Sequence, residues 1–392
     1  MIGLRLRNRS LRPIGLDIGH SSVKMIQLAM NGGQISVIAA GKTLIDAGID
    51  GDSQARRAAV ISAVKRMLAD GSFRGRDVVS CLPNDGLKIT SLRLGETGTE
   101  EIEQSLKKEV VQRFGLNPDK DAMDYMVAGD VQQGEEIKNE LILFAADNET
   151  IKSHIQMLEE AGLRPVAIDT VPCALFRIFE RSLRRQEDRE RTLVFVDVGS
   201  RWTVVVFGRG GEISFVKQIP IGGEKFNQEI ATRLGIKSGE AQMLRDKLRT
   251  EKGVRISQSG PVAQASDGNG QILDAATRQV IVDAISAVAE ELAREISLCL
   301  RYYTVTFRGK RVERAIFTGG EAYENILLNV LRRQLTVEIE VAQPLRGFDL
   351  SSEGAHVNFD SDRRGLLCEW AVAVGLSLKG WNGTKNAKSD TR

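Results

Sequence analysis

The chain carries one short pattern twice: an apolar run, then Asp, an apolar residue, Gly and small polar residues. The first copy spans residues 14–24 and the second spans residues 193–203. Each copy predicts a β-hairpin, two strands joined by a tight turn that contains glycine. Because the copies lie about 180 residues apart, they indicate an internal duplication in which one hairpin opens each half of the chain.

Each hairpin turn is a candidate phosphate site, because exposed backbone N–H groups can cradle an anion around one carboxylate. Asp17 and Asp197 are the expected magnesium ligands, acting through water, since Mg²⁺ usually combines one or two carboxylates with phosphates. The alternative for each aspartate is that it caps its own turn. The turn residues expected to contact a nucleotide are Gly19, His20, Ser21, Ser22, Gly199 and Ser200.

Lys24 follows Asp17 on the outgoing strand. It can reach back to a phosphate as a point charge, or it can be a surface lysine. Both readings stay open from the sequence.

Two Gly-Gly pairs come before predicted helices. The run 314–323 predicts a buried strand that ends in Gly319-Gly320-Glu321, with a helix from about 323 to 335. Gly222-Gly223 opens another helix. Glycine lets a flat ring or a phosphate approach the positive end of a helix, so these residues join the candidate nucleotide site. A plain tight connection is the alternative for both pairs.

Glu240 and Arg245 lie on the next predicted helix, residues 238–248. They could flank a purine ring, but an exposed ion pair on the helix surface is the better interpretation.

Composition excludes several function classes. The chain has 392 residues, 42% hydrophobic and 27% charged, as in soluble globular proteins of two or more domains. A net charge of +2 argues against a dedicated nucleic-acid binder. The cysteines are far apart, which favours reduced thiols over a metal site. The sequence also predicts no membrane span and no signal peptide.

The expected organisation is two lobes with one inserted unit. Residues 77–167 predict a β-α-β-β-α subdomain, a small sheet with two helices on one face. The first lobe then comprises residues 14–76, 168–186 and 365–380. The second comprises 192–235 and 310–364, with 236–309 as its own subdomain. A basic leader, 1–13, a polar loop, 255–270, and a polar tail, 381–392, complete the chain.

Taken in order, these motifs resemble the PilM family of type IV pilus assembly proteins, within the actin-like ATPase superfamily. The resemblance rests on residues 17–24, 161–163, 219–223, 318–320 and 372–378, and on the inserted unit, which is similar to the 1C subdomain of the division protein FtsA. It implies an α/β actin-like fold whose two lobes are duplicated copies of a ribonuclease-H-like unit.

The resemblance also implies a function. PilM-like proteins bind ATP between their two lobes and dock the short cytoplasmic N-terminus of the inner-membrane protein PilN near the 1A/1C junction. For this chain we expect ATP or ADP with Mg²⁺ at the interlobe site, docking on the inserted unit, and a role in a type IV pilus or a related secretion system. We therefore expect a cytoplasmic protein that lies at the inner membrane through its partners, with only indirect membrane contact, and that can form a homo-oligomer. No nucleic acid is expected as a partner.

Three departures weaken the expectation of ATP hydrolysis. His20 and the pair Arg201-Trp202 are bulky where relatives carry small polar residues. Where relatives offer a polar side chain to orient water, this chain has Val171, with Asp169 as a weak catalytic candidate. General-base help is worth ~10²–10⁴-fold, so slow or absent turnover is expected.

Other functions compete with the scaffold. A phosphotransferase such as a sugar kinase would need a carboxylate base and carries no comparable insert. An FtsA-like polymerising protein would need a C-terminal amphipathic helix, which the polar residues 381–392 do not form. The cytoplasmic half of a type II secretion protein would be expected to continue into a membrane span.

Overall fold

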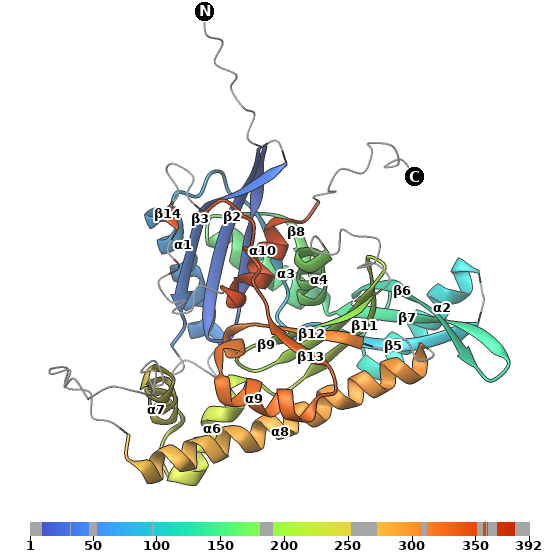
Figure 1. Ribbon diagram of the computed structural model, residues 1–392. Helices are drawn as coiled ribbons and strands as arrows, with labels where there is room; N and C mark the ends of the chain where they lie inside the picture. Colours follow the sequence, from blue (N-terminus) through green and yellow to red (C-terminus); the bar gives the residue numbers. More distant parts are fainter. Residues whose placement is uncertain are drawn as a thin grey trace, which may run out of the picture.

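The computed structural model describes residues 10–31, 33–46, 53–95, 98–180, 191–251, 273–307, 312–350, 356–357, 359 and 367–380. Over these residues the chain forms two large sheets and one small sheet, with helices packed around them (Figure 1). The leader 1–9, the loop 255–270, the tail 381–392 and most of 351–366 lie outside the described residues, so the expectations for them are not addressed.

The first large sheet contains the first hairpin. Its order is β14-β3-β2-β1-β4-β8. β1, β2 and β3 form an antiparallel meander, whereas β14 runs parallel to β3, β4 parallel to β1 and β8 parallel to β4. The strands are β1 (Ser10–Ile18), β2 (Ser22–Asn31), β3 (Gln34–Leu44), β4 (Asp77–Cys81), β8 (Arg164–Asp169) and β14 (His356–Val357).

The second large sheet repeats this plan in the order β11-β10-β9-β12-β13. Again a three-stranded antiparallel meander is extended by two parallel strands. The predicted two-lobed, duplicated fold is therefore confirmed. The strands are β9 (Thr192–Val198), β10 (Thr203–Arg209), β11 (Glu212–Ile219), β12 (Val312–Thr318) and β13 (Glu338–Val341). The runs in β9 and β10 are almost fully buried, as expected for strands covered on both faces.

The inserted unit is a separate three-stranded sheet of order β5-β7-β6. One face is covered by α2 (Thr99–Glu109) and its continuation η2 (Val110–Phe114), through Leu106 and Val110. The other face joins the main core and packs against β11, the edge strand of the second lobe. The strands are β5 (Lys88–Gly95), β6 (Ala122–Gln133) and β7 (Glu136–Ala146).

The predicted insert, 77–167, is too wide. The strands at its two ends, β4 and β8, pair with each other inside the first large sheet. Its second helix, α3 (Asn148–Glu160), packs with α1 (Ser53–Asp70) and not on the small sheet. Leu158 of α3 belongs to the first-lobe core, a destination that an amphipathic pattern alone does not specify.

Of the two helices expected to complete the first lobe, one packs on the second lobe instead. α4 (Val171–Glu180), expected in the first lobe, packs against the sheet of the second lobe, where Phe179 stacks on Phe195 with ring centroids 4.8 Å apart. α10 (Ala371–Ser377) packs on β1 and β2 of the first lobe, as predicted for the closing helix. The two helices also pack on each other and so join the lobes.

The remaining helices cover the second lobe. α8 runs the length of this lobe beneath its sheet, alongside α6 and α9, with α7 beyond α6 (Figure 1). Gly320–Tyr323 forms a 3₁₀ turn, η3, and α9 begins only at Asn325 because the Glu324 side chain caps it by accepting from Ile326 N. The helices are α6 (Gly223–Leu234), α7 (Ser238–Glu251), α8 (Ala275–Thr306) and α9 (Asn325–Gln334).

Candidate nucleotide site between the lobes

The two predicted hairpin turns have the same local structure. Gly19 N donates to Ser22 O at 3.0 Å, and Gly199 N donates to Trp202 O at 3.0 Å. Asp17 and Asp197 occupy matching places near the ends of β1 and β9. The duplication therefore presents one carboxylate from each lobe beside a tight turn.

Lys24 bonds to Asp17 across the first hairpin, with Nζ 3.0 Å from Oδ2. The two residues face each other in the register of β1 and β2. Burial alone would lower the pKa of Lys24, but the charges of Asp17, Glu369 and Asp197 outweigh it and raise that pKa. Lys24 is therefore a buried cation among carboxylates from both lobes and not a surface lysine.

Asp197 is the most perturbed carboxyl group of this site. Burial, reinforced by the negative charge of Asp17, raises the pKa of Asp197 to about 7, and Lys24 opposes the rise. The hairpin aspartates are thus close enough to repel each other. Although its carboxyl group is largely desolvated, Asp197 as a residue keeps some exposed surface, which leaves a path for an ion.

These oxygen donors fit a hydrated Mg²⁺ better than a protein-only metal cage. Mg²⁺ keeps several waters and is commonly held by one or two carboxylates together with substrate phosphates. Among the described residues no group of three or more His, Cys, Asp or Glu side chains is arranged to hold a metal. Asp17 and Asp197 would hold the ion through water, and Lys24 would meet phosphate charge.

The tips of the two hairpins meet at the start of α6. Glu224 accepts a hydrogen bond from Arg201 Nε at 2.8 Å, and its carboxylate lies 3.9 Å from His20 Nε2. The bulky residues at both tips therefore share one acidic partner across the interlobe gap. Ser21 helps to set the first turn, because its carbonyl accepts from Ile45 N, while Ser22 is buried beside it.

Gly222 and Gly223 pack tightly against the second hairpin. A Cβ on Gly222 would lie 2.5 Å from both Gly199 O and Ser200 O. Gly223 N donates to Gly199 O at 3.0 Å and Glu224 N donates to Ser200 O at 2.7 Å. The first N–H groups of α6 are thus bonded to the hairpin in this structure, so the glycines permit close packing.

The Gly-Gly turn after β12 lies directly beside Asp197. Gly319 has φ +92°, and a Cβ there would stand 2.8 Å from Asp197 Oδ1. Only glycine fits both the backbone angle and the contact. A Cβ on Gly320 would meet nothing within 4 Å, which leaves that side of the turn open.

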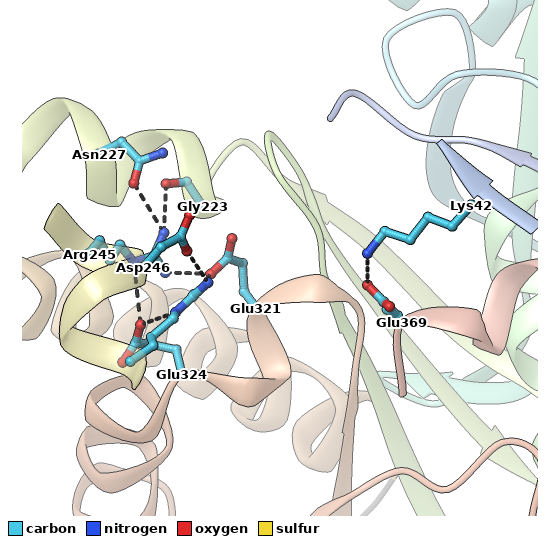
Figure 2. Close-up of polar contacts among 9 residues, drawn as sticks. Lys42, Gly223, Asn227, Arg245, Asp246, Glu321, Glu324 and Glu369 are labelled. Atoms are coloured by element: carbon cyan, nitrogen blue, oxygen red, sulfur yellow. Dashed lines mark hydrogen bonds and ion pairs between the residues drawn. The ribbon is translucent and has the colours of Figure 1, made fainter. Parts of the chain in front are cut away.

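Glu321 is held in a buried ion cluster of the second lobe (Figure 2). Arg245 and Arg249 of α7 pair with both Glu321 and Glu324, and Arg245 also donates to Gly223 O. Burial alone would raise the pKa of Glu321, but the two arginines outweigh it and hold that pKa below its ordinary value.

The surface ion pair expected of Arg245 is wrong. Arg245 is 2% exposed, and its guanidinium lies over the Phe226 ring, 4.6 Å from the centroid. Glu240, for which a surface ion pair was the better interpretation and a purine contact the alternative, is exposed in the first turn of α7 and accepts from Lys237 N at 3.0 Å. A helical pattern showed that both lie on one helix but not which of them points inward.

Asp169, the weak catalytic candidate, is tied into the join between α4 and α10. Its Oδ2 lies 2.8 Å from Arg177 Nη2 and 3.3 Å from Lys379 Nζ, and Oδ1 accepts from Thr170 N. Val171 beside it is buried at the start of α4. Both carboxylate oxygens of Asp169 therefore already have partners among the described residues.

A family model described as type IV pilus assembly protein PilM matches residues 15–253 and 270–381, which is most of the chain. The chain belongs to the PilM family. A solved structure titled as a PilM-PilN type IV pilus biogenesis complex shares 22% sequence identity with it, covering 97% of this chain and 100% of the other, with a TM-score of 0.69.

A second solved structure is the ethanolamine utilization protein EutJ from Carboxydothermus hydrogenoformans. It shares 13% identity and a TM-score of 0.51, covering 94% of this chain and 90% of that one. Both likenesses agree with the two-lobed, actin-like ATPase fold of the PilM-family chain. No helix in the described part of the chain is long and apolar enough to cross a membrane.

The structure adds site residues that the motifs did not indicate. Arg56 of α1 donates to Gly19 O and His20 O, both at 2.8 Å, and so braces the first turn. Lys42 of β3 bonds to Glu369 of η4 (Cys368–Trp370) at 2.6 Å (Figure 2). Neither residue belongs to a recognisable sequence motif, and only contacts with residues far away in the sequence connect them to the site.

Proposed function

We propose that this PilM-family chain is a cytoplasmic scaffold of type IV pilus assembly that closes on Mg²⁺ with ATP or ADP between its lobes. The observation that carries the proposal is the pairing of Asp17 and Asp197, one from each hairpin, around the buried cation Lys24. Because the negative charges of Asp17 and Asp197 act against each other, a further cation beside Lys24 is favoured; a Mg-nucleotide would supply one while its phosphates engage Lys24.

In this proposal the bound nucleotide has a structural role, and its hydrolysis is slow or absent. Asp169 is neutralised by Arg177 and Lys379, and Val171 offers no polar atom to a water molecule. The bound nucleotide would then stabilise the closed arrangement of the lobes instead of driving turnover.

The test of the nucleotide site separates the metal from the nucleotide. Replacing Asp17 or Asp197 by Ala should weaken binding of the Mg-nucleotide far more than binding of nucleotide in EDTA, since each carboxylate acts through the ion. Isothermal titration under both conditions measures this difference. Equal losses with and without Mg²⁺ would mean that the aspartates only shape their turns.

We further propose that the inserted sheet docks the cytoplasmic N-terminal peptide of a PilN-type inner-membrane protein. β5 and β6 are its outer strands, and an extended peptide can add to such a strand or lay apolar side chains beside it. Val127 and Ile137 of this unit are 51% and 68% exposed. The solved relative with PilN in its title supports the choice of partner.

Substitutions of exposed apolar residues test the docking site. Val127→Asp with Ile137→Asp should weaken binding of the partner peptide by on the order of tenfold or more, because a charge would be buried against apolar side chains. The matched control is Met243→Asp on α7, which is 72% exposed and remote from the insert in the chain. Unchanged binding in the double variant, or an equal loss in the control, would place docking elsewhere.

A further inference from the structure

One end of the first lobe gathers basic side chains that the nucleotide and peptide sites do not use. We call this set the basic band. It comes from four separate segments of the chain and lies where β1 begins and α10 ends (Figure 1). Its members are Arg12, Arg74, Arg76, Arg164 and Lys379.

Printed hydrogen bonds hold the band together. Gln27 Nε2 donates to Arg12 O at 3.2 Å and to Arg74 O at 2.7 Å, while its Oε1 accepts from Arg74 N. Arg12 Nη2 donates to Lys379 O at 2.6 Å, and Arg164 N donates to Arg76 O at 2.7 Å. The band is therefore a contiguous, braced surface and not a chance grouping in sequence.

The band has more positive than negative charge. Two of its members already pair with carboxylates, Arg164 with Asp77 and Lys379 with Asp169. Arg74 and Arg76 are exposed, and in the described part of the chain neither forms an ion pair with an acidic side chain. Both guanidinium groups are thus exposed and have no acidic partner among the described residues, although Arg76 Nη1 donates to Gly75 O at 3.0 Å.

An exposed apolar side chain lies beside the band. Leu11, next to Arg12, is 42% exposed. Basic residues with interspersed apolar side chains are the composition that binds anionic membrane surfaces.

We infer that the basic band binds the surface of an anionic phospholipid bilayer directly. Each arginine near such a surface is worth about fivefold in affinity, and Leu11 adds an apolar contact. Nucleic acid fits less well, because base stacking needs exposed aromatic side chains and the described residues of the band include none. This contact adds to the membrane association through a partner and does not depend on the peptide site.

Flotation of the full chain with lipid vesicles tests the inference. The chain should float with phosphatidylcholine vesicles that contain phosphatidylglycerol and not with phosphatidylcholine alone, and raised salt should release it. Arg74→Glu with Arg76→Glu should reduce binding by on the order of tenfold or more. The matched control, Arg332→Glu with Arg333→Glu on α9, makes the same charge change at exposed arginines of the second lobe and should bind normally.

Three results would overturn the inference: equal flotation with neutral vesicles, an equal loss in both variants, or wild-type binding by the band variant. Displacement of the chain from vesicles by duplex DNA at equal charge would instead assign the band to nucleic acid. Unchanged affinity of the band variant for the partner peptide and for MgADP checks that it is folded. It also separates failure here from failure of the proposed function.

Discussion

The raised pKa of Asp197 gives nucleotide binding at this site a defined pH dependence. Its pKa is about 7 because it is buried and faces Asp17. Below about pH 7 it holds a proton that Mg²⁺ must displace. Affinity for MgADP should therefore rise from about pH 6 to about pH 8, with proton release on binding.

Titration calorimetry in buffers of different ionisation enthalpy measures that proton release. Asp197→Asn carries no titrating group and should lose both the proton release and the pH dependence, along with much of the Mg²⁺ requirement. A wild-type affinity that is flat across this range would contradict a shared metal at the two hairpins.

His154 gives a second pH prediction, for stability. Its Nε2 lies 3.2 Å from Ser80 Oγ inside the first lobe, and burial lowers its pKa from 6.5 to about 4. The folded chain therefore resists protonation that the unfolded chain accepts. The contribution is complete above about pH 6.5 and is lost as pH falls toward about 4, by up to about 3 kcal/mol.

Urea unfolding at a series of pH values checks this slope. His154→Gln keeps a polar partner for Ser80 but does not titrate, so its free energy of unfolding should decline less steeply over the same interval. Parallel curves for the two proteins would show that His154 is not responsible.

At the scale of elements, the join between α4 and α10 depends on glycine. A Cβ on Gly375 would stand 2.0 Å from Ala174 O of α4. Gly375→Ala must therefore push the two helices apart, which should lower the free energy of unfolding by about 2–4 kcal/mol. Gly239→Ala on α7, where a Cβ meets nothing within 4 Å, should be neutral or slightly stabilising. Equal effects in urea denaturation would contradict the close packing.

A buried carboxylate fixes the inserted sheet to α8. Glu140 of β7 is 1% exposed, bonds to Arg93 Nε at 2.7 Å and accepts from Tyr302 Oη at 2.7 Å. Arg93 Nη2 also donates to Thr306 Oγ1 at 2.9 Å. This network links two elements that lie far apart in sequence.

Glu140→Ala leaves Arg93 and Tyr302 without their shared partner and should cost about 3 kcal/mol of unfolding free energy. The matched control is Glu340→Ala, which removes an exposed pair with Arg314 and should cost less than about 1 kcal/mol. Similar losses in denaturant unfolding would mean that the insert is not anchored here.

Sequence patterns predicted the elements well but not always what they pack against. The paired hairpins, the Gly-Gly turns and the long helix α8 follow from local chemistry, so they were recognisable. Where α3 and α4 pack depends on which sheet covers their apolar faces. Tertiary contacts decide this, and the local sequence does not. Likewise Lys24 and Arg245 proved buried because their partners come from distant segments.

At the scale of the molecule, a short turn connects the lobes beside the candidate nucleotide site. Cys368 O accepts from Gly319 N at 3.2 Å, which binds η4 to the Gly-Gly turn of the second lobe. The adjacent Glu369 reaches Lys42 of the first lobe and favours the charged form of Lys24. Contacts of η4 therefore connect the two lobes beside the candidate nucleotide site.

The most direct test of this account is the thermal unfolding of the full chain with MgADP or MgATP. A ligand present at about 100 times its Kd should add about 2.7 kcal/mol, enough for a clear rise in melting temperature. The account predicts this rise with Mg²⁺, a smaller one in EDTA, and none for a variant lacking both Asp17 and Asp197. A melting temperature that neither saturating nucleotide changes would contradict nucleotide binding between the lobes.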